Sequence, residues 1–125
     1  MSTVLIVDDC PAVRKTLRSL LEKLSSVVCI EAANGLDAIV KAKKSCLDLI
    51  ILDLGMPEMN GFETATALQK AMPQVPLFMF TSHDCLVVES QAALVGIHAV
   101  FSKYTGINAL LAQASELLNP SHALA

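Results

Sequence analysis

Short apolar runs alternate along this chain with longer segments whose apolar residues recur every three or four positions. The short runs have strand length and are rich in β-branched residues, whereas the longer segments place charged residues opposite an apolar stripe, as amphipathic helices do. The predicted strands are Thr3–Val7, Val27–Ala32, Leu47–Leu52, Pro76–Phe80 and Ile97–Phe101. The predicted helices are Pro11–Leu24, Leu36–Ser45, Gly61–Leu68, Asp84–Gly96 with a cap at each end, and Ile107–Leu118.

Strand and helix alternate five times, which predicts a three-layer α/β/α domain. The sheet is expected to be parallel, with right-handed crossovers and helices on both faces. No linker, sequence repeat or low-complexity segment divides the chain. Residues 1–120 are therefore predicted to form one domain, and residues 121–125 are predicted to form a frayed C-terminal tail.

The third predicted strand leads into Asp53 and then into a loop that contains Gly55, Pro57, Asn60 and Gly61. A strand buried on both faces of a parallel sheet is expected to be such a continuous apolar run. The loop residues are those that turn a backbone sharply. A carboxylate at the carboxyl end of a central parallel strand stands where open α/β sheets bind ligands, although a loop cap is an equally simple role for Asp53.

Composition narrows the classes of protein that this fold can serve. The chain has 125 residues, 54% of them hydrophobic, and a formal net charge of −3, which gives no reason to expect nucleic-acid binding. No apolar run reaches the ~18 residues that a membrane span needs. Met1 leads directly into the first strand without a signal peptide, so we expect a cytoplasmic protein. Its four scattered cysteines are then reduced thiols rather than disulfides or a zinc site, and Cys29 is a small core residue.

Polar residues follow four of the five predicted strands. Asp8 and Asp9 follow the first strand, Asp53 the third, Thr81 the fourth and Lys103 the fifth. Because parallel strands point their carboxyl ends the same way, we expect these side chains in one crevice. Clustered carboxylates repel one another unless a cation intervenes, and Mg²⁺ prefers oxygen ligands. A carboxylate nucleophile, a divalent ion, an ammonium and a hydroxyl are what phosphoryl transfer to an aspartate requires.

Each of these residues also has a simpler interpretation. Asp8 and Asp9 could be a helix N-terminal pair favoured by the helix dipole, Thr81 a helix cap and Lys103 a solvated loop lysine. Their convergence from four separate strand ends favours the joint interpretation.

At these residues the chain resembles the receiver domain of bacterial two-component response regulators, from about Val4 to Leu118. The pair Asp8-Asp9 matches the acidic metal pair of that family. Asp53, followed by the pattern Met56-Pro57-x-Met59-x-Gly61, matches its phosphoacceptor motif. Thr81 matches its switch hydroxyl, and Lys103 matches its invariant lysine.

The resemblance implies a flavodoxin-like sheet of order 2-1-3-4-5. It also implies Mg²⁺ held by Asp9, Asp53 and the backbone carbonyl of Gly55, with Asp8 acting mainly through water. Asp53 would accept a phosphoryl group from a sensor histidine kinase or a phosphotransfer protein. Such a domain is a signalling phosphoacceptor rather than a metabolic enzyme, because it catalyses only its own phosphorylation and slow dephosphorylation.

The resemblance further implies how the signal leaves the domain. Thr81 and Lys103 would bind the phosphoryl oxygens, and this shift would remodel the face made by the fourth helix, the fifth strand and the fifth helix. A downstream protein target or a fused output domain would then bind the remodelled face. The sequence leaves open whether the chain acts alone, as a homodimer or as part of a longer regulator.

The segment around Lys103 departs from the pattern usual in this family. Tyr104 follows the lysine where a proline is common, so we expect a trans Lys103–Tyr104 peptide bond. Val100 stands where an aromatic residue usually reports phosphorylation, and strand alternation should point the neighbouring Phe101 to the other face of the sheet. The rotating aromatic residue of many relatives is therefore missing.

Two further features bear on signalling. Gly55 and His83 stand two residues after the phosphoacceptor and the switch hydroxyl, where they flank the route of a hydrolytic water. The consecutive residues Leu86, Val87 and Val88 cannot all face the core of an amphipathic helix, so at least one should lie on its outer face.

Three alternatives use the same kind of fold. An FMN-binding flavodoxin-like electron carrier needs a hydroxyl- and glycine-rich phosphate cradle after the first strand, where Asp8 and Asp9 would repel a phosphate. A phosphatase of the haloacid dehalogenase type needs a second aspartate two residues after the nucleophile, where Gly55 stands. A pseudo-receiver, acting as a phosphorylation-independent interaction module, would have lost the acidic pair or the lysine, and all are present.

Overall fold

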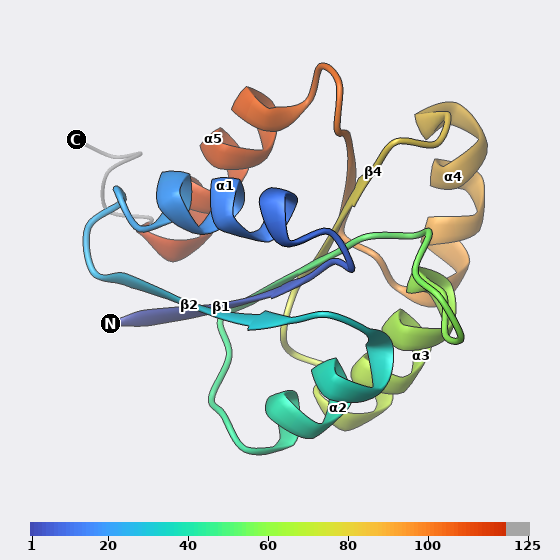
Figure 1. Ribbon diagram of the computed structural model, residues 1–125, viewed down its shortest axis with the longest axis horizontal. Helices are drawn as coiled ribbons and strands as arrows, with labels where there is room; N and C mark the ends of the chain where they lie inside the picture. Colours follow the sequence, from blue (N-terminus) through green and yellow to red (C-terminus); the bar gives the residue numbers. More distant parts are fainter. Residues whose placement is uncertain (120–125) are drawn as a thin grey trace.

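Five parallel strands form one sheet in the order β2-β1-β3-β4-β5 (Figure 1). In chain order they are β1 (Ser2–Val7), β2 (Val27–Ala32), β3 (Leu49–Leu52), β4 (Leu77–Thr81) and β5 (Ala99–Ser102). The predicted α/β class and strand order are thus confirmed. The computed structural model describes residues 1–119, so the predicted tail at residues 121–125 lies outside the described residues and the domain limit stays a prediction.

The helices connect successive strands. They are α1 (Pro11–Leu21), α2 (Gly35–Lys43), α3 (Gly61–Ala71), α4 (Cys85–Ala92), the 3₁₀ turn η1 (Ala93–Val95) and α5 (Ile107–Leu118). Proline at the first position of α1 and asparagine caps before α2 and α3 fix where these helices start. Among residues 1–119, no helix is both long and apolar enough to cross a membrane.

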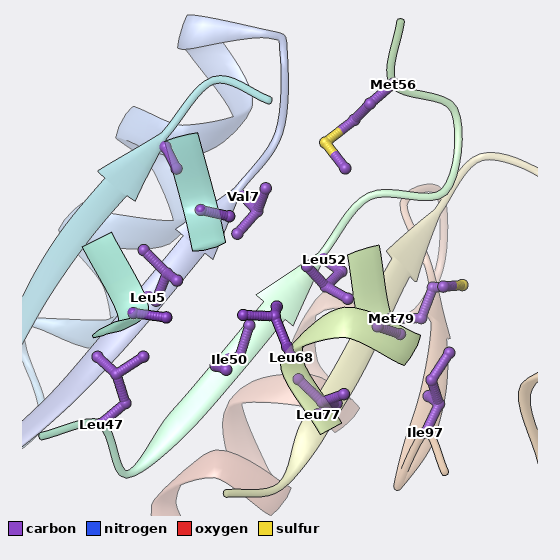
Figure 2. Packing of buried hydrophobic residues seen from close by; sticks show 14 of the residues in the cluster. Leu5, Val7, Leu47, Ile50, Leu52, Met56, Leu68, Leu77, Met79 and Ile97 are labelled. Atoms are coloured by element: carbon purple, nitrogen blue, oxygen red, sulfur yellow. The ribbon is translucent and has the colours of Figure 1, made fainter. Parts of the chain in front are cut away.

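Alternation along the strands separates two buried clusters, one on each face of the sheet. In β1, Leu5 and Val7 belong to the cluster under α2, α3 and α4, whereas Val4 and Ile6 belong to the cluster under α1 and α5. Figure 2 shows the first cluster, in which Leu68 of α3 lies beside the side chains of β3. Burial on both faces explains why the strands are continuous apolar runs in the sequence.

The ends of three helices differ from the prediction. α2 spans Gly35–Lys43 rather than Leu36–Ser45, and α3 continues to Ala71 rather than Leu68. α1 ends at Leu21 rather than Leu24, and the chain then turns toward β2 through Ser26, whose φ of 60° is left-handed. The fourth predicted helix ends at Gly96 as predicted, where φ is 78°, but its last turn is the 3₁₀ turn η1. β5 begins at Ala99, two residues later than predicted.

All four cysteines are free thiols. Cys29 lies buried in β2, as predicted, and burial raises the pKa of its thiol to about 12. The thiol is therefore an inert core group at neutral pH.

Candidate functional site

The strand ends that carry the predicted site residues lie at one edge of the sheet. The Asp53 N–H donates to the Val7 carbonyl at 2.9 Å, and the Lys103 N–H donates to the Thr81 carbonyl at 2.8 Å. These hydrogen bonds continue the parallel ladders one residue beyond the strands. The polar side chains that follow β1, β3 and β5 therefore start from the same level of the sheet.

Three carboxylates converge at this edge. Asp8, Asp9 and Asp53 each bring one oxygen within 4.8 Å of the other two. Asp8 and Asp53 are only 2% and 5% exposed, whereas Asp9 and the neighbouring Gly55 face solvent. Because hard divalent cations such as Mg²⁺ take oxygen ligands and keep several waters, this half-open set of oxygens suits Mg²⁺.

Lys103 reaches into the carboxylate cluster from the loop after β5. Its Nζ lies 2.7 Å from Oδ2 of Asp8 and 3.3 Å from Oδ1 of Asp53. Burial by itself would lower the pKa of this ammonium, but the hydrogen bonds and charges of the two carboxylates raise the pKa above its usual value. Lys103 is therefore a fixed positive charge beside both buried aspartates.

The single ammonium does not neutralise the cluster. Three carboxylates and one ammonium carry a formal charge of −2, which is the charge that one divalent cation balances. Burial raises the pKa of Asp8 above the usual range, and the charge of Asp53 adds to this, against the hydrogen bonds donated by Lys103 and the Cys10 N–H. The site thus holds negative charge at a cost in free energy that a bound cation would remove.

The loop after β3 brings the backbone of Asp53 against the start of α3. The Gly61 N–H donates to the Leu54 carbonyl at 2.9 Å, and a Cβ on Gly61 would lie 2.5 Å from the Asp53 carbonyl oxygen. Asn60 and Glu63 form a capping box that fixes the first turn of α3. Glycine is therefore required at position 61 because two backbone segments touch there.

The Thr81 side chain lies at the end of β4 and is fully buried. Its Oγ1 accepts the backbone N–H of His83 at 3.0 Å and lies 3.2 Å from Nδ1 of the same residue. The exposed His83 ring also faces the loop after β3, because a Cβ on Gly55 would lie 3.3 Å from its Cε1. The two residues predicted to flank the site from opposite loops are thus neighbours.

A second group of residues supports the acidic loop, and the sequence interpretation missed it. Arg14 of α1 donates from its guanidinium to the Asp8 carbonyl at 2.7 Å and pairs with Glu31 of β2 at 3.0 Å. Arg18 pairs with the other oxygen of Glu31 at 2.8 Å. Hydrogen bonds from Arg18 and Arg14 lower the pKa of Glu31. The only signal in the sequence was a single acidic residue inside the apolar run of β2.

The departures near β5 appear as expected. Val100 is partly buried and packs against the cluster on the α4 side, whereas Phe101 belongs to the cluster on the α1 and α5 side, where its ring lies 5.2 Å from that of Phe78. The Lys103–Tyr104 peptide bond is trans. Of the three apolar residues early in α4, the first two are exposed and only the third is buried: Leu86 81%, Val87 62% and Val88 4%.

Known proteins share both the sequence pattern and the fold. Residues 4–115 match the family model of the response regulator receiver domain. A putative transcriptional regulator of Pseudomonas aeruginosa is 33% identical over 118 residues, which are 94% of this chain and 57% of that protein. The chain thus spans little more than half of that relative.

Solved structures agree. The chemotaxis protein CheY4 of Vibrio cholerae has a TM-score of 0.85 and 28% identity, covering 94% of this chain and 98% of that one. The response regulator TrrA of Thermotoga maritima, solved in complex with Mg²⁺ and BeF, has a TM-score of 0.83 and 26% identity, covering 94% and 99%. With this fold, this acidic edge and a match over nearly the whole chain, the protein belongs to the response regulator receiver domain family of two-component systems.

Proposed function

We propose that Asp53 is the phosphoacceptor of this receiver domain and takes its phosphoryl group from a phosphohistidine on a sensor histidine kinase or a phosphotransfer protein. The observation that carries the proposal is the pairing of a 5% exposed carboxylate with a lysine ammonium 3.3 Å away and two further carboxylates within 4.8 Å. A carboxylate without cations would be a poor nucleophile toward an anionic phosphoryl group, whereas this one stands beside one cation and in a set of ligands for a second.

The residues divide the chemistry among themselves. The Asp53 carboxylate attacks phosphorus, its new O–P bond forms as the N–P bond breaks, and the histidine nitrogen keeps the electron pair. Asp9, Asp53 and the Gly55 carbonyl would hold Mg²⁺, with Asp8 acting through water, and the bound ion would supply positive charge near the phosphoryl oxygens. Lys103 supplies a second, permanent charge and moves from Asp53 toward the phosphoryl oxygens.

The output of the domain follows from Thr81. Its hydroxyl donates to a phosphoryl oxygen on Asp53, and the movement at the end of β4 alters the face made by α4, β5 and α5. Leu86 and Val87 of α4 are exposed apolar residues, which a downstream protein or an output domain would contact.

Intact-mass measurement tests the proposal. The protein is incubated with acetyl phosphate, with Mg²⁺ or with EDTA, and Asp53→Asn is compared with Asp48→Asn. The control makes the same change at the other end of the same strand, where Asp48 accepts the Thr3 N–H. We expect a base-labile, phosphate-sized mass increase in wild type and the control only, and only with Mg²⁺. An adduct that persists in Asp53→Asn would contradict the proposal, because another residue would then be the acceptor. No adduct in wild type, even with a competent kinase, would contradict it and favour a pseudo-receiver.

A further inference from the structure

The Thr81 hydroxyl is already engaged in the resting molecule. One lone pair of Oγ1 accepts the His83 backbone N–H at 3.0 Å, and Nδ1 of the His83 ring lies 3.2 Å away. A threonine hydroxyl has a single proton to donate. When the neutral ring carries its own proton on Nε2, Nδ1 is an acceptor, and the Thr81 hydroxyl donates its hydrogen bond to Nδ1. The same proton cannot then reach a phosphoryl group on Asp53.

The His83 ring lies between three parts of the switch. Its Nδ1 lies within hydrogen-bonding distance of the Thr81 hydroxyl. Its Cε1 would lie 3.3 Å from a Cβ on Gly55, in the loop that carries the phosphoacceptor. His83 also precedes Asp84, the N-cap of α4, whose Oδ1 accepts the Leu86 N–H at 2.9 Å. A change at the ring is therefore one residue away from the start of α4.

Val100 cannot supply the usual coupling. It has no ring to rotate, and its aromatic neighbour Phe101 packs on the opposite face of the sheet against Phe78. A side chain near Thr81 other than residue 100 is therefore the candidate for linking a change at Thr81 to α4. Among the described residues, His83 is the one whose side chain lies within hydrogen-bonding distance of the Thr81 hydroxyl.

We propose that His83 is the positioning residue that couples Thr81 to α4, an inference that rests on the phosphoacceptor role of Asp53. In the resting state its ring holds the Thr81 hydroxyl proton away from Asp53. Phosphorylation exchanges that hydrogen bond for one to a phosphoryl oxygen. The ring is then released, and with it the backbone that leads into the N-terminus of α4. The backbone hydrogen bond from the His83 N–H to Oγ1 is independent of the His83 side chain, so it persists in the His83 variants that keep Thr81.

Titration with beryllofluoride, which stands in for the phosphoryl group, in the presence of Mg²⁺ tests the coupling. In His83→Leu the hydroxyl no longer has a partner to give up, so we expect tighter beryllofluoride binding by about two- to tenfold, the value of one neutral hydrogen bond. In His83→Asn an amide oxygen replaces Nδ1 as acceptor, and affinity should stay within about twofold of wild type. His83 is exposed, so neither substitution is expected to unfold the chain.

A Thr81→Ala background separates the coupling from a steric effect of the ring on the site. There the step from His83 to Leu should change the affinity by less than about twofold, because the hydroxyl on which His83 acts is absent. An equal increase in both backgrounds, or no increase in either, would overturn the coupling. Wild type that fails to bind beryllofluoride would overturn the phosphoacceptor proposal as well, so the two failures are distinguishable.

Nuclear magnetic resonance supplies a readout that a purely structural role would not move. We expect the resting His83 ring in the Nε2–H tautomer with Nδ1 accepting, and loss of that hydrogen bond on addition of beryllofluoride. The amide signals of α4 from Leu86 onward should shift in wild type and His83→Asn, and much less in His83→Leu. A resting Nδ1–H tautomer, or α4 shifts that are the same in all three proteins, would refute the coupling.

Discussion

Removing the negative charge of Asp53 should stabilise the metal-free protein, although it abolishes the proposed function. At an effective dielectric constant of about 20, two unit charges at 4.8 Å, the upper limit for the oxygens of this cluster, repel by about 3.5 kcal/mol. Asp53 has two such neighbours, Asp8 and Asp9, so Asp53→Asn relieves about 7 kcal/mol on this scale. The lost attraction to Lys103 at 3.3 Å costs about 5 kcal/mol on the same scale.

The balance favours the variant. The difference is about 2 kcal/mol, and solvent screens part of the repulsion from the exposed Asp9, so we expect a gain of about 1–2 kcal/mol in the free energy of unfolding. For a chain of this size the gain corresponds to a rise of roughly 3–8 °C in the unfolding temperature.

Urea unfolding in EDTA and in excess Mg²⁺ measures both sides of this balance. In EDTA, Asp53→Asn should be more stable than wild type, whereas Glu116→Gln, the same loss of charge on an exposed residue of α5, should change stability by less than about 0.5 kcal/mol. Mg²⁺ should stabilise wild type strongly and the variant weakly, because a ligand stabilises only the state that binds it. A variant less stable than wild type in EDTA would refute the charge argument.

Three further predictions concern the loops and the supporting ion pairs. Gly61→Ala should lower the free energy of unfolding by about 1–3 kcal/mol in urea titrations, because the new Cβ would lie 2.5 Å from a backbone oxygen. Gly55→Ala should lower it by less than about 1 kcal/mol, because the new Cβ would meet only the movable His83 ring, at 3.3 Å. Equal losses would show that the contact at position 61 is not the cause. Arg14→Met removes the donor to the Asp8 carbonyl, so calorimetry should show Mg²⁺ binding weakened by about 10-fold or more, with little change in fold. Unchanged affinity would contradict a supporting role for Arg14. Burial raises the pKa of Asp8, so the folded state binds the Asp8 proton more tightly than the unfolded state does. The stability that protonated Asp8 contributes is therefore lost as pH rises from the usual carboxyl range through the folded pKa. The stability difference between wild type and Asp8→Asn in EDTA should therefore shift against wild type as pH rises over that interval, and a pH-independent difference would rule out this titration.

The sequence determined the fold and the main chemistry of the site because both depend on patterns that are local or topological. Continuous apolar runs predicted strands buried on both faces, and strand–helix alternation predicted a parallel sheet. Once the strands are parallel, residues at their carboxyl ends must meet, so Asp8, Asp53 and Lys103 could be placed together without coordinates. The helix ends at Leu21, Lys43 and Ala71 were less predictable, since tertiary packing and backbone turns set them, whereas the end at Gly96 followed from the glycine itself.

Tertiary structure alone decided which side chains touch. The sequence placed Lys103 near the aspartates, but not its 2.7 Å contact with Asp8, and it gave no sign that Arg14 joins Asp8 to Glu31. It marked His83 only by its distance from Thr81 along the chain, whereas the structure brings its ring to the threonine hydroxyl and to the loop after Asp53. These contacts depend on side-chain rotamers and on loops that have no periodic pattern. The amino-acid sequence therefore specified which groups gather at the site, and the packing of the loops specified how they are connected.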